Sequence, residues 1–390
     1  MNTSFDKPTI KSRLKSKGVK WHLDSEDVIP LWLADQDYPL CPEVKQALVQ
    51  AAKDEYTVYP QDEPVKELVS EKLKRHNKLD IPSSQVMMTQ GVIPGMWLSA
   101  MHACTPGDEI IVNDPMYYPF FMLVDRVRAR PVHWKLDLAE GYKFDMEGLK
   151  QCIGPKTKLI YVCNPHNPCG RVMTKEELKA IADIAVDKNI YVFVDELWED
   201  ILNDGRKHIS LASLSPEIAN LTITSWGFSK TYSVPGLQAG YLATSNKYIF
   251  ENLQKIAGGV LRGTNNFSLA IAEPILSGKC DYWVKELNAY LEEVRDLVEK
   301  RLGEMADVTI PKLQGTYLMF PKFNYGLTSD ELESFFKKEA KVTFNNGHHF
   351  GEEGQGHMRI LSATSKGIMN KALDRVEKSI PKLEKLAKSK

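Results

Sequence analysis

Residues 221–241, LTITSWGFSKTYSVPGLQAGY, place a single lysine, Lys230, between an apolar run and a Pro-Gly turn. The run 221–224 is typical of a β-strand, because β-branched and apolar side chains favour extended backbone. Ser229 and Thr231 flank the lysine, and these small hydroxyl residues leave room for a phosphate. An amine in this setting can form a Schiff base with an aldehyde. The chain has 50 lysines and arginines, most of which should be solvated, so this stretch gains meaning only from the residues around it.

Short apolar runs alternate with helical patterns over much of the chain. These runs are VMMTQG (86–91), DEIIVND (108–114), PVHWKLD (131–137), KLIYVCN (158–164), NIYVFVDE (189–196), LTITSW (221–226) and YLATS (241–245). Continuous apolar runs indicate strands that are buried on both faces. Their alternation with helices predicts an α/β fold with a mostly parallel, doubly wound sheet. Thr174 and Glu177 form a capping-box pattern, which predicts the start of one of these helices.

The two ends of the chain follow another pattern. Residues 1–41 are mostly irregular and predict an arm that lies across another surface. A long amphipathic helix is expected over 281–304, followed by short strands and a final helix. We therefore expect a large domain at 42–275 and a small α+β domain at 276–390, with the arm as part of the small domain.

The composition disfavours several classes of partner. The 390 residues include 50 basic and 51 acidic side chains, so nothing favours nucleic acid or an anionic membrane surface. No run approaches the roughly 18 apolar residues that could span a bilayer, and the N-terminus lacks the apolar core of a secretion signal. Six cysteines lack the spacing of zinc sites or of a disulfide framework, which predicts reduced thiols and a cytoplasmic protein. We expect no metal at the pair His348 and His349 or at His357, because no carboxylate has a matching spacing.

Chemically distinctive residues follow the predicted strands, at the sheet edge where α/β proteins bind ligands. The glycine turn at 91–95 opens a helix and suits a phosphate, and the aromatic rings at 117–118 can stack on a flat heterocycle. Asp195 can keep a pyridine nitrogen protonated, and Asn167 can hydrogen-bond a phenolic oxygen. Lys230 can bind an aldehyde and move a proton. Each residue has an ordinary structural explanation, as a turn, core ring or helix cap, but together they match one cofactor chemistry.

Four motifs carry a family resemblance. In chain order they are NPHNPCG (164–170), VDELW (194–198), GFSKTYSVPGLQ (227–238) and HMRI (357–360). Together they resemble the fold type I pyridoxal-phosphate enzymes of aminotransferase class I/II, over nearly the whole chain. The resemblance implies the PLP-dependent transferase fold and pyridoxal 5'-phosphate (PLP) as cofactor. It also implies transfer of an amino group between an L-amino acid, aspartate-type or of broad specificity, and a 2-oxo acid.

The resemblance also implies roles for the cofactor-binding residues. Lys230 matches the lysine of the internal aldimine, and Asp195 matches the partner of the pyridine nitrogen. Asn167 matches the partner of the ring O3', and Tyr117 the stacking ring. The implied phosphate contacts are Gly91, Val92, Ile93 and Ser229.

Substrate and subunit contacts are implied in the same way. Arg359 matches the arginine that binds the substrate α-carboxylate, a task suited to a bidentate guanidinium. We place Ala34 and Asn167 beside it in the substrate site. Tyr59 matches a tyrosine that reaches the phosphate of the neighbouring subunit, so the resemblance implies a homodimer with active sites at the interface. Arg262 is a candidate for a distal substrate carboxylate, with a structural role equally open.

Two positions depart from the family pattern. Gln238 stands where many relatives have an arginine paired with the phosphate, so this position brings no positive charge. Trp198 stands where a tyrosine is common, and its indole can only donate a hydrogen bond. We keep both among the expected cofactor-binding residues, with an altered contact to O3' at Trp198.

The reaction itself stays open between two outcomes. The segment KWHLDSEDVIPLWLADQDYP (20–39) and the GLQ after the lysine resemble cystathionine β-lyase-like carbon-sulfur lyases. In contrast, RILSATS (359–365) and the DEL segment (195–197) resemble transaminases such as aspartate aminotransferase. We favour transamination, the commoner outcome in this superfamily. A non-enzymatic regulatory or binding protein on this fold is a third possibility, against which the complete set of matching residues argues.

Overall fold

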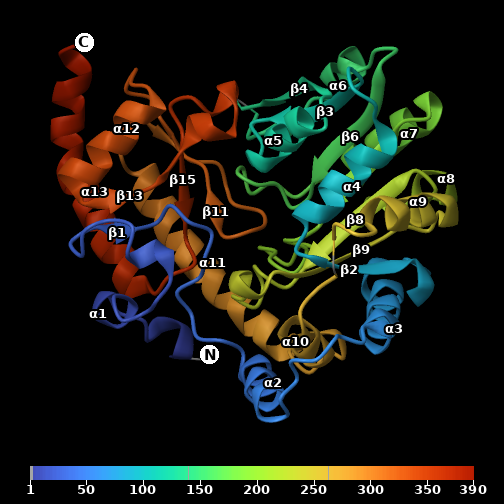
Figure 1. Ribbon diagram of the computed structural model, residues 1–390. Helices are drawn as coiled ribbons and strands as arrows, with labels where there is room; N and C mark the ends of the chain where they lie inside the picture. Colours follow the sequence, from blue (N-terminus) through green and yellow to red (C-terminus); the bar gives the residue numbers. More distant parts are fainter. Residues whose placement is uncertain (1–2, 139, 262) are drawn as a thin grey trace.

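An eight-stranded β-sheet forms the middle layer of one half of the computed structural model, which describes residues 3–138, 140–261 and 263–390 (Figure 1). In spatial order its strands are β2 (Val86–Gln90), β9 (Ala239–Ala243), β8 (Thr222–Gly227), β7 (Tyr191–Asp195), β6 (Thr157–Cys163), β3 (Glu109–Asp114), β4 (Arg130–Asp137) and β5 (Lys143–Phe144). Strands β8, β7, β6, β3 and β4 run parallel. Strand β9 pairs antiparallel with both β8 and β2, and β5 pairs antiparallel with β4. The mostly parallel sheet predicted from the apolar runs is therefore confirmed.

Helices cover both faces of this sheet. In chain order the helices are α1 (Ile10–Arg13), α2 (Pro42–Lys53), α3 (Glu63–Lys72), α4 (Ile93–Ala103), α5 (Pro119–Arg126), α6 (Met146–Cys152), α7 (Lys175–Lys188), α8 (Pro216–Ala219), α9 (Lys247–Ala257), α10 (Asn266–Leu276), α11 (Asp281–Gly303), α12 (Ser329–Phe335) and α13 (Lys366–Lys388). The capping box of Thr174 and Glu177 opens α7, as predicted. No helix among the described residues combines the length and the apolar character that crossing a membrane requires.

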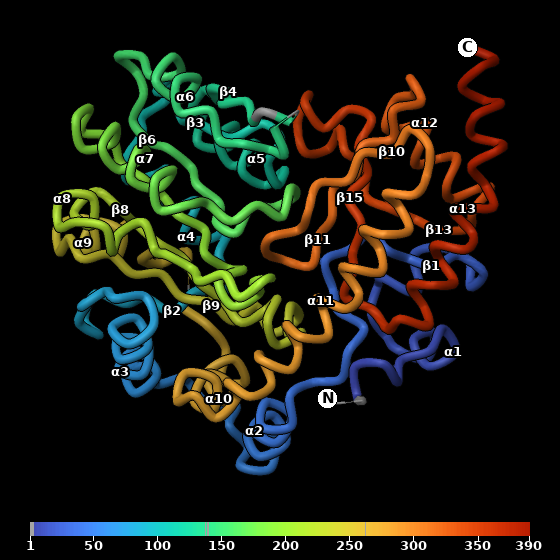
Figure 2. Tube along the Cα trace, turned by 180° about the vertical axis from the view of Figure 1, so that it is seen from behind, coloured from blue at the N-terminus to red at the C-terminus, as the bar shows by residue number. Residues whose placement is uncertain are grey.

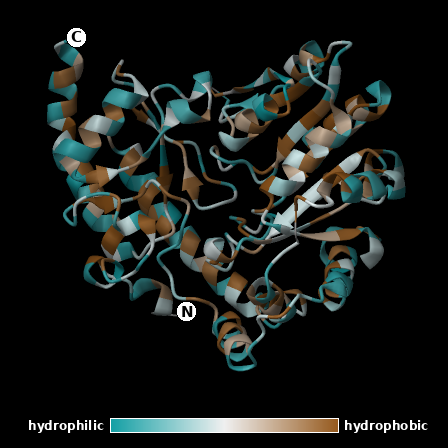
Figure 3. Cartoon of the chain, in the orientation of Figure 1, coloured by the Kyte–Doolittle hydropathy of each residue, from teal (hydrophilic) through white to brown (hydrophobic). Residues whose placement is uncertain are grey.

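Two hydrophobic clusters explain why the strands read as continuous apolar runs. Along β3, Ile110 and Val112 pack into a cluster with residues of α4, α5 and α9, whereas Ile111 packs into a cluster with residues of α6, α7 and α8. Successive side chains of a strand point to opposite faces, so helices on both faces demand apolar residues at every position. The helices themselves carry both hydrophobic and hydrophilic residues, as Figure 3 shows.

The remaining elements lie beside the sheet domain and join the two ends of the chain. Strand β1 (Ile29–Pro30) of the arm pairs parallel with β13 (Val342–Thr343), and Figure 2 shows the arm beside the C-terminal part. The other short strands are β10 (Val308–Thr309), β11 (Leu318–Met319), β12 (Lys322–Phe323), β14 (Asn345–Asn346) and β15 (Met358–Leu361). This pairing supports our proposal that the arm at 1–41 belongs with a small domain at 276–390, beside a large domain at 42–275.

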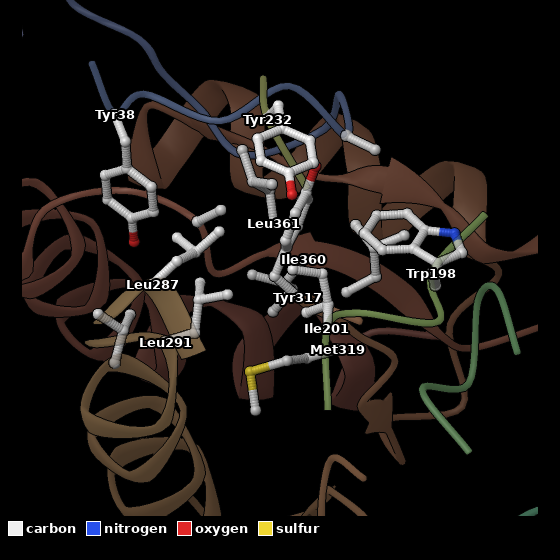
Figure 4. Packing of buried hydrophobic residues seen from close by; sticks show 14 of the residues in the cluster. Tyr38, Trp198, Ile201, Tyr232, Leu287, Leu291, Tyr317, Met319, Ile360 and Leu361 are labelled. Carbon is white, nitrogen blue, oxygen red and sulfur yellow. The ribbon is translucent and has the colours of Figure 1, made fainter. Parts of the chain in front are cut away.

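A third hydrophobic cluster connects these parts (Figure 4). It brings Tyr38 of the arm, Leu287 of α11 and Ile360 of β15 together with Tyr317. Trp198, which follows β7 of the central sheet, belongs to the same cluster. The core of the C-terminal part therefore continues to the edge of the central sheet where the candidate site lies.

Candidate active site

The site begins at the carboxyl ends of three parallel strands. The strand register pairs Cys163 of β6 with Asp195 of β7, and Asp195 with Ser225 of β8. Consequently the segments that follow these strands leave the sheet side by side. Asp195 is the last residue of β7, whereas Asn167 and Lys230 belong to the segments that follow β6 and β8.

Lys230 lies under the N-terminal arm. Its Nζ donates a hydrogen bond to the backbone oxygen of Ala34 at 2.8 Å, and lies 5.8 Å from the centre of the Trp198 ring. Burial lowers the pKa of Lys230 to about 8, and the positive charge of Arg359 acts in the same direction. A lowered pKa increases the neutral fraction of the amine, which is the form that reacts with an aldehyde.

Asp195 is a buried carboxylate at the end of β7. Its Oδ1 accepts a hydrogen bond from the backbone N–H of Leu197 at 2.9 Å. Burial raises the pKa of Asp195 to about 7, and the neighbouring Glu196 carboxylate contributes in the same direction. Removing a carboxylate from water penalises its charged form unless a cation lies close by. The environment of Asp195 therefore suits a ligand that brings a positive charge.

Arg359 reaches the same site from β15, and its side chain is 3% exposed. One terminal nitrogen donates to Oδ1 of Asn167 and the other to the backbone oxygen of Trp32, each at 3.1 Å. The guanidinium lies 4.7 Å from the centre of the Phe350 ring. Burial lowers the pKa of Arg359 to about 10, and its Nε has no hydrogen-bond partner among the described residues. A buried cation with an unused donor is suited to bind an anion.

Tyr117 and Asn167 are joined through the backbone, since the N–H of Tyr117 donates to the Asn167 oxygen at 3.1 Å. The Tyr117 ring lies 4.9 Å from that of Tyr118. Both aromatic residues predicted after β3 therefore lie beside the Asn167 segment. Burial raises the pKa of Tyr117, so its hydroxyl stays protonated near neutral pH.

The glycine turn at 91–93 and Gln238 lie at one end of β2 and β9. Gly91 has a φ of +82°, a conformation that other residues rarely adopt. A Cβ at Gly240 would lie 2.8 Å from Cα of Gly91, so only glycine allows this close approach. Because Gln90 pairs with Ala239, Gln238 leaves its strand beside this turn. Helix α4 begins at Ile93, where the first N–H groups of a helix lack intrahelical partners and suit a phosphate.

Three further predicted residues have distinct surroundings. Trp198 is buried and packs edge-on against Tyr317 at 4.6 Å, so it forms a wall of the Lys230 site. Ser229 precedes Lys230 and its backbone oxygen accepts from Val234 N at 3.3 Å. Tyr59 is 97% exposed on the loop between α2 and α3 and does not join the site within one chain. Arg262 lies outside the described residues.

The structure adds residues that the sequence did not single out. The side-chain amide of Gln36 donates to the backbone oxygen of Lys230. The Tyr317 hydroxyl donates to the same oxygen at 3.4 Å. The one available signal was the position of Gln36 within the arm segment that also contains Trp32 and Ala34.

Comparison with known proteins decides what this site belongs to. Residues 26–376 match the sequence pattern of the family aminotransferase class I and II. The chain belongs to this family. It is 30% identical to the aromatic-amino-acid aminotransferase 2 of Thermococcus litoralis over 358 residues, which cover 90% of this chain and 92% of the relative. It is 28% identical to the cystathionine β-lyase PatB of Bacillus subtilis in an alignment 391 positions long, gaps included, which covers 97% of this chain and all of the relative.

The structure of this aminotransferase-family chain is also similar to that of a PLP-containing protein. Cystalysin from Treponema denticola superposes with a TM-score of 0.90 at 26% identity, over 96% of this chain and 98% of cystalysin. The comparisons together identify the chain as a PLP-dependent aminotransferase. The site fits this cofactor, because the buried Asp195 suits a protonated ring nitrogen and the glycine turn at 91–93 leaves space for a phosphate.

Proposed function

We propose that Lys230 binds the PLP aldehyde and moves the α-proton of the amino-acid substrate during transamination. The main observation that supports this proposal is that the Lys230 amine, with a pKa lowered to about 8, lies in one site with the buried Asp195 and Arg359. When bound, PLP supplies an electron sink that stabilises negative charge at the substrate α-carbon. A lysine with this pKa can accept and return a proton near neutral pH.

Asp195, Asn167 and Tyr117 would hold the cofactor ring. Asp195 would form an ion pair with the ring nitrogen, which would lower its own pKa from the raised value. Asn167 would donate its side-chain amide to the ring oxygen while its Oδ1 keeps the contact with Arg359. Tyr117, fixed to the Asn167 backbone, would stack on the ring. Gly91, Val92, Ile93, Ser229 and Gln238 would surround the phosphate, and Trp198 would close the side of the ring.

Arg359 would bind the α-carboxylate of the substrate. Asn167 and the Trp32 carbonyl orient two of its nitrogens, and Nε remains as a further donor. A carboxylate would compensate the buried positive charge and restore the pKa of Arg359. Ala34 would lie on the other side of the substrate, next to the Lys230 amine that it contacts.

We also propose a cytoplasmic homodimer in which Tyr59 completes the site of the second copy. Tyr59 and the adjacent Val58 are 97% and 68% exposed, which is unusual for a large ring beside an apolar residue. Their loop is nevertheless anchored, since Asn266 donates to the backbone oxygens of Tyr56 at 3.1 Å and Val58 at 2.6 Å. An anchored loop with exposed apolar side chains suits a contact with another chain.

The substrates we propose are L-amino acids of the aspartate and aromatic types with 2-oxo acid partners. The Phe350 ring lies 4.7 Å from the Arg359 guanidinium, and the Tyr118 ring lies 6.4 Å from that of Phe350 and 4.9 Å from that of Tyr117. These rings provide an apolar surface for a substrate side chain. The name of the Thermococcus litoralis relative supports an aromatic donor.

A carbon-sulfur β-lyase is the second candidate function. The cystathionine β-lyase PatB aligns over its entire length and over 97% of this chain. The two reactions need the same contacts to the α-carboxylate and the same proton acceptor. They differ in whether the substrate carries a leaving group at its β-carbon.

The decisive experiment records the absorption spectrum of the PLP-loaded enzyme with one amino acid at a time and no 2-oxo acid. Aspartate, alanine, phenylalanine and cystathionine are the test compounds. Conversion of the cofactor to its amine form, with one equivalent of 2-oxo acid, supports transamination and identifies the donor. An unchanged cofactor with continuous release of thiol, ammonia and 2-oxo acid from cystathionine would instead establish the lyase. If neither occurs with any amino acid, the proposed function is wrong.

A further inference from the structure

Two cysteines far apart in the sequence meet a carboxylate away from the active site. Cys41 is the N-cap residue of α2, and Cys280 is the N-cap residue of α11. Both are buried with 0% exposure, and each is a free thiol. Their sulfur atoms and a carboxylate oxygen of Glu43 all lie within 4.8 Å of one another.

Hydrogen bonds join Cys41, Glu43 and Tyr282. Cys41 donates its thiol proton to Oε2 of Glu43 at 3.0 Å, and the Cys280 sulfur lies within 4.8 Å of both groups. The hydroxyl of Tyr282 contacts both oxygens of Glu43, at 2.8 and 3.1 Å. The carboxylate is therefore fixed from outside while it faces the thiols. Metal-binding residues typically have such a supporting partner.

We propose that Cys41, Cys280 and Glu43 form a binding site for one zinc-class divalent cation. Two thiolates and a carboxylate are ligands that Zn²⁺ prefers. Around a tetrahedral zinc ion with bonds of about 2.3 Å to sulfur and 2.0–2.2 Å to oxygen, donor atoms lie roughly 3.5–3.8 Å apart. This spacing fits within the 4.8 Å that encloses the three donors.

A metal ion must replace the protons of both thiols. Helices α2 and α11 both begin at this cluster, and the positive end of a helix dipole stabilises negative charge. Binding would displace the protons of both thiols to water as hydronium, with no change in oxidation state.

An entry path and a fourth ligand are also available. Glu43 borders a cavity of about 530 Å³ that is also lined by Gln46, Gln50 and Lys279. A water molecule from this cavity can complete the coordination of an ion held by three protein ligands. The ion would join the end of the arm to the start of the long helix α11.

A second group of side chains that could hold a metal ion has different surroundings; it is formed by Glu196, Glu199 and His208. There the ammonium of Lys72 pairs with the Glu199 carboxylate, and Glu196 accepts from Trp226 at 2.8 Å. The positively charged Lys72 side chain therefore already occupies the position that a metal ion would take. Among the described residues, no lysine or arginine lies between the donor atoms of Cys41, Glu43 and Cys280.

The test titrates Zn²⁺ into the reduced, PLP-loaded enzyme and measures bound metal after dialysis, together with protons released. We expect one ion per chain, two protons released per ion, and a higher Tm. The variants Cys41→Ser and Cys280→Ser should lose this ion. Cys152→Ser, which removes a thiol whose neighbour is the His133 carbonyl, should bind zinc as the unmodified enzyme does.

Glu43→Gln keeps both thiols and provides a second test of the site in case a cysteine variant fails to fold. Circular dichroism would show whether each variant is folded. We expect it to weaken zinc binding by at least about tenfold, the loss typical even for an outer partner of a metal ligand. The proposal is overturned if the reduced enzyme binds no zinc, or if the double variant Cys41→Ser/Cys280→Ser retains it. It is equally overturned if a mild oxidant links the two cysteines while the reduced enzyme binds no metal, which would make them a redox pair.

Discussion

Replacing Asp195 with asparagine should have opposite effects on the protein with and without its cofactor. Burial raises the pKa of Asp195 from 3.8 to about 7. Because a tenfold change in proton affinity corresponds to about 1.36 kcal/mol, we expect the ionised carboxylate to destabilise the cofactor-free fold by about 4 kcal/mol. Asparagine has the same shape without a charge, so this penalty disappears in the variant.

The sign of the effect follows from the direction of the shift. The pKa of this acid is higher in the folded state than in the unfolded state. Its contribution to stability is therefore fully present below the unfolded-state pKa of 3.8 and is lost as the pH rises to the folded-state pKa of about 7. Relative to Asp195→Asn, the cofactor-free enzyme should therefore lose stability between about pH 4 and pH 7, and no further above it. With PLP bound, Asp195 should form an ion pair with the protonated ring nitrogen. Asparagine has no charge and cannot form this ion pair, so the variant should bind PLP more weakly.

Urea unfolding of both proteins at pH 5 and pH 8, with and without PLP, measures these differences. In the cofactor-free state the variant should gain up to about 4 kcal/mol relative to the unmodified enzyme at pH 8. Loss of one charge-assisted hydrogen bond, about 2 kcal/mol, should weaken PLP binding about thirtyfold. An equal stability of the two cofactor-free proteins at both pH values would refute the electrostatic reasoning about Asp195.

Three further predictions concern the other charged groups. Lys230→Ala should abolish turnover while leaving the fold intact; measurable turnover in a variant with a native circular dichroism spectrum would contradict its role. Arg359→Lys keeps the charge but loses the bidentate geometry. It should lower kcat/KM about thirtyfold, for a loss of about 2 kcal/mol, and unchanged kinetics would place the substrate carboxylate elsewhere. Because the pKa of Lys230 is about 8, the rate at which PLP recombines with the cofactor-free enzyme should rise with pH up to about 8 and then level off. Stopped-flow absorbance measures this rate, and a profile that is flat between pH 6 and pH 9 would contradict the lowered pKa.

The sequence predicted the central sheet well because burial on both faces leaves a clear mark. Every residue of a strand such as β3 needs an apolar partner on one face or the other, so the strand appears as a continuous apolar run. The two-residue strands of the C-terminal part leave no such mark. Pairing such as that of β1 with β13 depends on contacts between distant segments, which the periodicity of a single segment does not contain.

The sequence predicted the site residues that lie at the ends of the sheet strands. It did not predict all of those that the arm and the C-terminal part contribute. Asn167, Asp195 and Lys230 lie at or just after the carboxyl ends of three neighbouring strands, so the topology of the sheet brings them together. Gln36 and Phe350 reach the same site from the arm and from the C-terminal part, and no local pattern marks them. The cluster of Cys41 and Cys280 illustrates the same limit, since spacing rules detect only metal sites whose ligands are close in sequence.

The N-terminal arm contacts two charged side chains of the active site. The backbone oxygen of Trp32 accepts from Arg359 and that of Ala34 from Lys230, so one short segment holds the side chains proposed to bind substrate and cofactor. The same segment is anchored at Asp37, whose carboxylate pairs with the buried Lys20 at 2.8 Å and accepts from Trp21. A buried ion pair of this kind adds little net stability, but it fixes one geometry, because removing either partner leaves a buried charge uncompensated. We therefore expect the buried pair of Lys20 and Asp37 to serve mainly to fix the arm. In this position the carbonyls of the segment can accept hydrogen bonds from Arg359 and Lys230.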